Sequence, residues 1–234
     1  MIRLLLISSS RVHGGGWLDL FAGEIDAFLG RSIRRAAFVP FAIADHAGYH
    51  AKARERFAAF GVELEPLHGP DDDRERIASA EAVVVGGGNT FRLLATLQAR
   101  GLLEPLRLRA RAGMPFVGWS AGSNLACPTI RTTNDMPIVE TQGLDALGLI
   151  PFQINPHYVD ADPASTHMGE TREQRIEEFL EENDVPVLGL REGAFLRREG
   201  AELYLGGVAG ARRFRRGAPP EEHAVGARLD SMLA

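Results

Sequence analysis

The sequence Gly118-Trp-Ser-Ala-Gly122 lies between an apolar run, residues 114–119, and a run suited to a helix, residues 121–126. This G-x-S-x-G pattern between a strand and a helix is typical of a nucleophile elbow, a tight turn that exposes a serine hydroxyl. Small flanking residues let the backbone turn sharply and let a carbonyl substrate approach. The N–H of Ala121 would then point at the oxyanion that forms. Taken alone, the pattern fits an ordinary strand-to-helix turn equally well, because the chain contains 26 glycines.

A serine nucleophile needs a base. The single lysine, Lys52, lies in a charged helical stretch, so histidine is the better candidate among the seven in the chain. His157 closes Phe152-Gln-Ile-Asn-Pro-His157, a short apolar strand that the proline brings to an end. The ends of strands are where α/β sheets gather their binding sites. We therefore predict that His157 is the base; the alternative is a structural histidine bonded to a backbone carbonyl.

A third group, usually a carboxylate, orients the histidine. Glu192 follows a buried strand, residues 185–190, whereas Asp135 lies in a polar loop, residues 132–136. Asp160 and Asp162 are close to His157 in sequence but are typical of loop acids. Glu192 is favoured because, like Ser120 and His157, it falls at the carboxyl end of a strand. The resulting order of nucleophile, histidine and acid differs from that of α/β-hydrolases, which argues against that fold.

A second oxyanion donor is expected in the triple glycine of Val85-Gly-Gly-Gly-Asn-Thr-Phe91, which follows a buried strand. Glycines let bare backbone amides face a ligand, and Gly88 N–H is the predicted donor. Asn89 is assigned to substrate binding, although it is also suited to cap the helix that follows. The segment lacks both the G-x-G-x-x-G spacing and the Lys-Ser/Thr of a phosphate-binding loop. The alternative is a tight turn that needs a positive φ.

The alternation of strand and helix patterns predicts an α/β fold, a mostly parallel sheet with helices on both faces. Expected strands are residues 3–8, 36–41, 62–67, 81–86 and 114–119, and expected helices are residues 17–29, 48–60, 91–100, 121–126 and 173–182. After the strand at 185–190 the pattern changes to short strands at 194–198, 201–205 and 211–216. These indicate C-terminal antiparallel hairpins at one edge of the sheet. The whole chain, residues 1–234, is expected to form one domain.

Four segments together resemble peptidase E, the aspartyl dipeptidase family of serine peptidases. They are Val85-Gly-Gly-Gly-Asn-Thr-Phe91, residues 118–139 (GWSAGSNLACPTIRTTNDMPIV), Gln153-Ile-Asn-Pro-His157 and Gly169-Glu-Thr-Arg-Glu-Gln-Arg-Ile176. The likeness runs from the first strand to the last hairpins, and its central block is far longer than a G-x-S-x-G match. It implies a fold related to class I glutamine amidotransferases and hydrolysis of dipeptides with an N-terminal aspartate.

The resemblance also implies roles for individual residues. Ser120 matches the nucleophile, His157 the base and Glu192 the third member, while Asp135 matches a further acid of the site. Gly88 and Ala121 match the oxyanion donors. The chain departs from the family at Ser123, where alanine is common and no effect is expected, and at Arg191, which is placed to shift the pKa of Glu192.

Arg172 matches a residue suited to binding the substrate's aspartate side chain. A carboxylate in a site needs a cation, and with one lysine in the chain that cation should be arginine. Arg131 and Arg175 are the alternatives. The structural alternative is that Arg172 forms a surface ion pair with Glu170 or Glu173.

Composition narrows the classes of function. The net charge is −5 with 45% hydrophobic residues. Arginines cluster at residues 107–111 and 212–216, and the second cluster fits a solvated strand face better than a nucleic-acid surface. No run is long enough to cross a membrane, and the N-terminal apolar run is too short for a secretion signal. One cysteine, Cys127, excludes an internal disulfide and fits the cytoplasm. Cys127 is expected to be a packed residue rather than the elbow cysteine of an amidotransferase.

No metal or organic cofactor is expected. His46 and His50 have i,i+4 spacing, but the glutamate of H-E-x-x-H is missing and Gly48 is expected to interrupt the helix. The expected partners are small dipeptides, with a homodimer implied by the resemblance. Two other functions stay open: a cyanophycinase-like hydrolase of the same fold, and a catalytically inactive module that binds an acidic small molecule.

Overall fold

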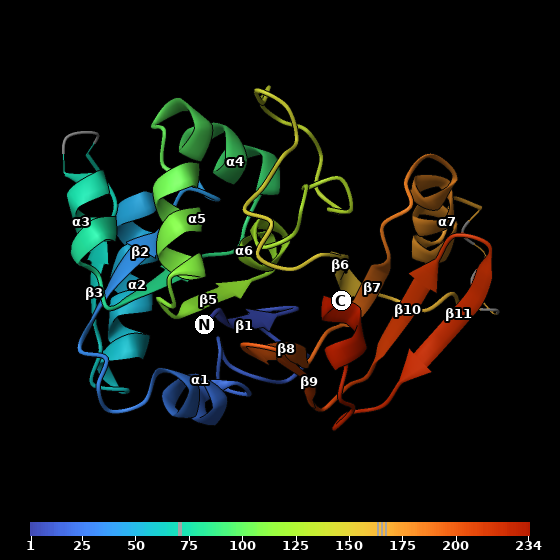
Figure 1. The fold of residues 1–234 in the computed structure, drawn as a ribbon, viewed down its shortest axis with the longest axis horizontal. Coiled ribbons are helices and arrows are strands. Elements are labelled where there is room, and N and C mark those ends of the chain that lie inside the picture. Colours follow the sequence, from blue (N-terminus) through green and yellow to red (C-terminus); the bar gives the residue numbers. More distant parts are fainter. Residues whose placement is uncertain (70–71, 163, 165, 167) are drawn as a thin grey trace.

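The structure, a computed structural model, describes residues 1–69, 72–162, 164, 166 and 168–234. Its main sheet has seven strands in the order β3-β2-β4-β5-β1-β8-β9 (Figure 1). The first five in this order run parallel, and β8 and β9 add an antiparallel hairpin at the edge. The strands are β1 (Arg3–Ile7), β2 (Arg35–Val39), β3 (Glu63–Pro66), β4 (Ala82–Val85), β5 (Phe116–Trp119), β8 (Ala194–Glu199) and β9 (Glu202–Gly207).

Helices cover both faces of this sheet, because its central strands are apolar on both sides. On one face Leu5 and Val84 pack with α1 (Ala22–Leu29) and α2 (His46–Ala58). On the other face Leu6 and Val85 pack with α3 to α6. These helices are α3 (Asp73–Ser79), α4 (Thr90–Ala99), α5 (Leu103–Arg111) and α6 (Ala121–Leu125). The predicted doubly covered parallel sheet is confirmed.

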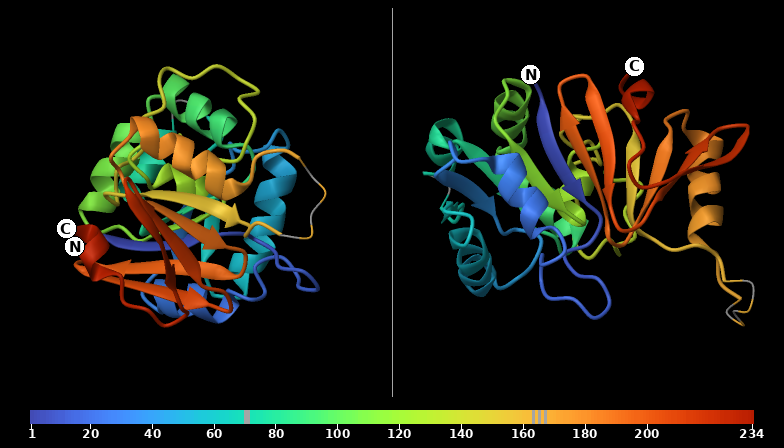
Figure 2. Two further views of the ribbon diagram at one scale, coloured as in Figure 1. Left: turned by 90° about the vertical axis from the view of Figure 1, so that its right-hand side faces the viewer. Right: turned by 90° about the horizontal axis from the view of Figure 1, so that it is seen from below.

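A second sheet of four strands, in the order β11-β10-β7-β6, stands beside the main one. Its strands are β6 (Gln153–Tyr158), β7 (Val187–Arg191), β10 (Ala211–Arg215) and β11 (Ala218–His223). Helix α7 (Arg172–Glu182) packs on it through a small separate core that includes Tyr158 and Phe214. Figures 1 and 2 show α7 at the end of the molecule opposite α2.

The sequence did not predict this second sheet. The hairpin expected at 194–198 and 201–205 does form the edge of the main sheet, but the strand expected at 211–216 pairs with β7 and β11 instead. Arg213 and Arg215 of that strand form ion pairs with Glu221, as expected of a solvated face. A short 3-10 helix, Asp230–Leu233, follows the last strand.

Three helical expectations need correction. Helices α3 and α5 were not predicted, because four of the seven residues of α3 are charged and the arginines of α5 interrupt its apolar pattern. In α5, Arg109 donates hydrogen bonds to the backbone carbonyls of Ile77 and Ala80. Gly48 does not interrupt α2, since the Asp45 side chain caps this helix by accepting the Gly48 N–H. Among the described residues, no helix combines the length and hydrophobicity that crossing a membrane requires.

Candidate active site

Ser120 lies in the turn between β5 and α6 with φ 53° and ψ −113°. A positive φ is uncommon for a residue with a side chain and is found where the fold holds a functional residue in place. The turn is fixed by a hydrogen bond from Ser120 N–H to the carbonyl of Ile7, the last residue of β1, at 3.0 Å. The predicted strand–turn–helix setting of the serine is therefore present.

The two glycines of the elbow allow close packing of α6 against the sheet. A Cβ added to Gly122 would lie 2.3 Å from the carbonyl oxygen of Val85 in β4. A Cβ added to Gly118 would lie 2.6 Å from the carbonyl oxygen of Gly122. Both distances are too short for real contacts, so any side chain here would push the helix, and with it Ser120, away from the sheet.

Ser123, expected to have no effect, takes part in this packing. Its hydroxyl is buried and lies 2.8 Å from the Ile7 carbonyl oxygen and 3.0 Å from that of Gly118. The same Ile7 carbonyl also accepts the Ser120 N–H. Ser123 therefore links the elbow to the end of β1 through a buried hydrogen bond.

His157 and Glu192 complete a hydrogen-bonded chain with Ser120. His157 Nε2 lies 2.9 Å from Ser120 Oγ, and His157 Nδ1 lies 2.7 Å from Glu192 Oε1. Ser120 follows β5 of the main sheet, whereas His157 belongs to β6 and Glu192 follows β7, both in the second sheet. The three residues therefore meet at the junction of the two sheets.

Asp135 has different partners. Its Oδ2 accepts the Thr90 N–H at 2.7 Å and lies 2.6 Å from Thr90 Oγ1 and 3.1 Å from Thr133 Oγ1. Thr90 is the first residue of α4, so Asp135 satisfies an N–H at the positive end of that helix. The carboxylate partner of the imidazole is Glu192. Asp135 instead contacts the start of α4, which directly follows the glycine loop.

The glycine loop approaches the serine closely. A Cβ added to Gly87 would lie 3.1 Å from Ser120 Cβ, and one added to Gly88 would lie 2.5 Å from the carbonyl oxygen of Ala42. Gly88 has φ 139°, a conformation that favours glycine. In the described part of the chain neither Gly88 N–H nor Ala121 N–H donates a hydrogen bond. Both donors predicted for the oxyanion are thus unengaged.

Asn89 has two structural contacts. Its Oδ1 caps α4 by accepting the Arg92 N–H at 3.0 Å, and its Nδ2 donates to the Met136 carbonyl at 2.9 Å. The side chain therefore holds the glycine loop to the segment that carries Asp135. This arrangement is the capping role that the sequence also allowed, and it leaves a single side-chain N–H for a substrate contact.

Tyr49, which the sequence analysis did not single out, supports the loop from the other side. Trp119 Nε1 donates to the Tyr49 hydroxyl at 2.9 Å, and a Cβ on Gly86 would lie 2.8 Å from that oxygen. Burial raises the pKa of Tyr49 well above its usual value, so the phenol stays neutral. No sequence pattern distinguishes this tyrosine, because its role depends on α2 packing beside the elbow.

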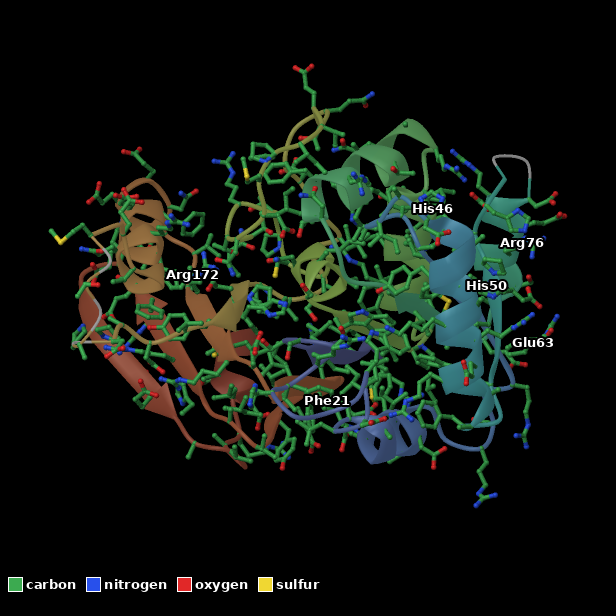
Figure 3. All side chains as sticks on the ribbon, turned by 180° about the vertical axis from the view of Figure 1, so that it is seen from behind. Phe21, His46, His50, Glu63, Arg76 and Arg172 are labelled. Carbon is green, nitrogen blue, oxygen red and sulfur yellow. The ribbon has the colours of Figure 1, made fainter. Side chains whose placement is uncertain are left out.

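Arg172 is the first residue of α7, and Figure 3 labels it beside that helix. The neighbouring acids have other partners: Glu170 pairs with Arg175, and Glu173 with Arg212. Within the described residues Arg172 itself forms no ion pair, so the ordinary surface pairing is not seen. Partial burial and the nearby Arg175 hold the pKa of Arg172 below its usual value. Arg172 lines a pocket of about 260 Å³ with residues that follow His157, including Asp160 and Asp162.

Arg191 does not pair with Glu192, the neighbour whose pKa it was expected to shift. Its guanidinium contacts both oxygens of Asp160, at 2.7 and 2.6 Å, and both of Glu222, at 3.0 and 3.1 Å. These carboxylates raise the pKa of Arg191, and the Arg191 hydrogen bonds in turn lower the pKa of Asp160. The ion pair between Arg191 and Asp160 links the residue that precedes Glu192 to the segment that follows His157.

His46 and His50 lie one turn apart on α2 (Figure 3). His50 Nε2 lies 2.8 Å from the backbone carbonyl oxygen of Leu64. Among the described residues, His46 and His50 included, no group of three or more histidine, cysteine, aspartate and glutamate side chains is arranged to hold a metal ion.

Cys127 is predicted to be inert. The thiol is fully buried, accepts the Ile154 N–H at 3.2 Å, and has its pKa raised by burial to about 12. Because the thiolate is the reactive form, iodoacetamide at neutral pH should modify the folded protein very slowly and leave its activity intact. Mass spectrometry before and after unfolding measures the modification. Loss of activity in proportion to alkylation of the folded protein would restore a cysteine mechanism.

A serine hydroxyl, an imidazole and a carboxylate hydrogen-bonded in sequence, beside two unengaged amides, is the arrangement of a serine hydrolase. The model of Peptidase family S51 matches residues 4–206. The chain belongs to this family of peptidases.

Named relatives agree with this assignment. A Peptidase E of Streptomyces coelicolor is 53% identical over 99% of this chain and 95% of its own length. A probable alpha-aspartyl dipeptidase of Drosophila melanogaster is 44% identical over 99% of this chain and 97% of its own. The crystal structure of a peptidase from an acI-B1 Actinobacterium has the same fold, with a TM-score of 0.69 at 17% identity over 98% of this chain and 97% of that one.

Proposed function

We propose that this peptidase hydrolyses dipeptides with an N-terminal aspartate through an acyl-enzyme on Ser120. The observation that carries the mechanism is the hydrogen-bonded chain from Ser120 Oγ through His157 to Glu192, at 2.9 and 2.7 Å. Support for the substrate class comes from the relatives named as Peptidase E and probable alpha-aspartyl dipeptidase.

In the first half of the reaction, Ser120 Oγ attacks the peptide carbonyl while His157 Nε2 takes its proton. Glu192 accepts the Nδ1–H of the imidazole, which fixes the tautomer and stabilises the imidazolium that forms. The oxyanion of the tetrahedral intermediate accepts hydrogen bonds from Ala121 N–H and Gly88 N–H. The intermediate collapses as His157 donates its proton to the departing amine.

In the second half, water replaces the departed amino acid. His157 Nε2 takes a proton from this water as the oxygen attacks the aspartyl ester, and the same two amides stabilise the second oxyanion. Collapse returns the proton to Ser120 Oγ and releases aspartate. Every proton in this cycle moves through the imidazole, so no further base is required.

The deciding assay is incubation of the purified protein with Asp-Leu and measurement of free leucine. Release of leucine that stops in Ser120→Ala supports the proposal. Hydrolysis of the aspartate–arginine polymer cyanophycin without hydrolysis of Asp-Leu would indicate the cyanophycinase-like alternative. Saturable binding of an acidic dipeptide with no turnover of either compound would indicate an inactive binding module.

The two candidate acids should give different losses when neutralised. Glu192→Gln should lower kcat by about two or more orders of magnitude, because the amide no longer accepts the Nδ1–H of the catalytic tautomer as a charged group does. Asp135→Asn should lower kcat less, and should mainly lower the free energy of unfolding, since Asp135 contacts Thr90 and Thr133. Steady-state kinetics with Asp-Leu and thermal unfolding of both variants measure this. A crippled Asp135→Asn beside a near-normal Glu192→Gln would reverse the assignment.

Arg172 is proposed to bind the carboxylate of the substrate's aspartate side chain. Arg172→Ala should reduce kcat/KM for Asp-Leu by a factor that corresponds to about 2–4 kcal/mol of transition-state stabilisation, because the carboxylate loses a charged partner. The reduction should be much smaller for Asn-Leu, a poor substrate with no side-chain charge. Arg175→Ala is the matched control, since Arg175 pairs with Glu170. Equal losses for the two dipeptides would make Arg172 structural.

Three further expectations accompany this function. We treat residues 1–234 as one peptidase domain, which the core cluster that includes both Leu4 and Met232 supports. A cytoplasmic location rests on the single, buried cysteine. A homodimer rests on the family resemblance, and sedimentation of the purified protein tests it.

A further inference from the structure

Ser8 lies directly after β1, at the junction of the two sheets, and is fully buried. Its hydroxyl donates a hydrogen bond to the Leu190 carbonyl at 2.7 Å and accepts the His157 N–H at 2.9 Å. Its own N–H donates to the Ala194 carbonyl at 3.0 Å. One residue at the end of β1 therefore contacts β6, β7 and the start of β8.

The contact to His157 satisfies an amide that the sheet does not pair. In the register of β6 and β7, Pro156 pairs with Leu190 and Tyr158 pairs with Arg191, which leaves His157 in an irregularity between them. His157 also has φ 54°, in the left-handed region. This conformation is unfavourable for a residue with a side chain, so neighbouring contacts must maintain it.

A bulge of this kind re-aims a side chain. In a regular strand the side chains of successive residues point to opposite faces, so the irregularity determines where the imidazole points. With Ser8 Oγ holding the amide, the ring reaches Ser120 Oγ on one side and Glu192 on the other. Ser8 also holds Leu190, two residues before Glu192.

We propose that Ser8 is a positioning residue for the catalytic centre: its hydroxyl holds the bulge that aims His157 at Ser120 and fixes the strand that presents Glu192. This inference rests on the proposed Ser120–His157–Glu192 mechanism. Ser8 touches neither the substrate nor the reacting atoms. Its loss should therefore reduce the rate of the chemical step and leave substrate binding nearly unchanged.

Ser8→Ala tests the proposal, with Ser9→Ala as the matched control. Ser9 is the next residue and is equally buried, but its hydroxyl has no hydrogen-bond partner among the described residues. Ser8→Ala should lower kcat for Asp-Leu by about 10- to 100-fold, as expected when a catalytic group is misplaced by about 1 Å. KM should change by less than about threefold. Ser9→Ala should stay within about twofold of wild type in both constants.

A second readout does not depend on turnover. In protein labelled with ¹⁵N-histidine, the proton shared by His157 Nδ1 and Glu192 gives a far-downfield NMR signal, assigned by its loss in His157→Ala. Ser8→Ala should shift or broaden this signal, whereas Ser9→Ala should leave it in place. If Ser8→Ala does not fold, Ser8→Cys takes its place, because it fills the same space with longer and weaker hydrogen bonds.

Equal kcat values for the Ser8 and Ser9 variants, with the downfield signal unchanged in both, would overturn the proposal. So would a loss in Ser8→Ala that appears only in thermal stability. Failure of the mechanism itself is recognised separately, because Ser120→Ala would then keep its activity whatever the Ser8 variants do.

Discussion

Ser120→Ala should yield a folded protein whose kcat for Asp-Leu is at least about three orders of magnitude below wild type, as for removal of a triad member. The substitution removes the atom that forms the acyl bond and leaves the elbow intact, because the Ser120 N–H and the glycines around it keep their contacts. The residual rate would come from substrate binding and the oxyanion amides. Leucine release under saturating substrate and circular dichroism of the variant measure the two parts of this prediction.

Ser123→Ala is the control for this result. It removes a hydroxyl from the same turn, but one that is buried and bonded to backbone carbonyls under the elbow. Ser123→Ala should lower the free energy of unfolding by about 0.5–1.5 kcal/mol, the contribution of one hydrogen bond. Its kcat should stay within a few-fold of wild type. A Ser120→Ala enzyme that kept more than about a tenth of the wild-type kcat would remove Ser120 from the mechanism.

His157→Ala should produce a loss of the same size, about three orders of magnitude or 4 kcal/mol in activation free energy. The serine is a poor nucleophile without a base, so either substitution disables the same step. For that reason the Ser120→Ala/His157→Ala double variant should be no slower than the single variants by more than a few-fold.

The double variant distinguishes a shared step from two independent ones. Losses that multiply would mean that Ser120 and His157 act separately, which contradicts the hydrogen bond of 2.9 Å between them. His50→Ala is the matched control and should keep its kcat, because this α2 histidine lies against the Leu64 carbonyl of β3. Loss of activity in that variant alone would place the base elsewhere.

Much of the site can be predicted from the sequence, because its residues lie where strands end. Ser120 and Gly88 both follow apolar runs of four or more residues, and the glycines beside them are local signals of turns. The parallel main sheet with helices on both faces follows from the same alternation of patterns. Local sequence was sufficient here because each of these features depends on a few neighbouring residues.

The sequence favoured Glu192 over Asp135 as the partner of His157 only because Glu192 follows a strand, and the contacts that each acid makes could not be predicted. Asp135 and Glu192 both lie outside regular elements, and only the packed chain shows that Asp135 accepts the Thr90 N–H at the start of α4 while Glu192 contacts His157. The choice depends on contacts between residues 45 and 35 positions apart. No local pattern encodes such distances.

The sequence by itself determined the strand–turn–helix around Ser120, the candidate base and the class of fold, because hydrophobic periodicity and glycine placement act over short spans of chain. The tertiary structure alone decided that β6 and β7 leave the main sheet for a second one. It also decided that a bulge, with Ser8 behind it, turns His157 toward the serine. The physical reason is that strand pairing and buried hydrogen bonds are settled between distant segments, where each strand finds the partner that satisfies its backbone and buries its apolar face.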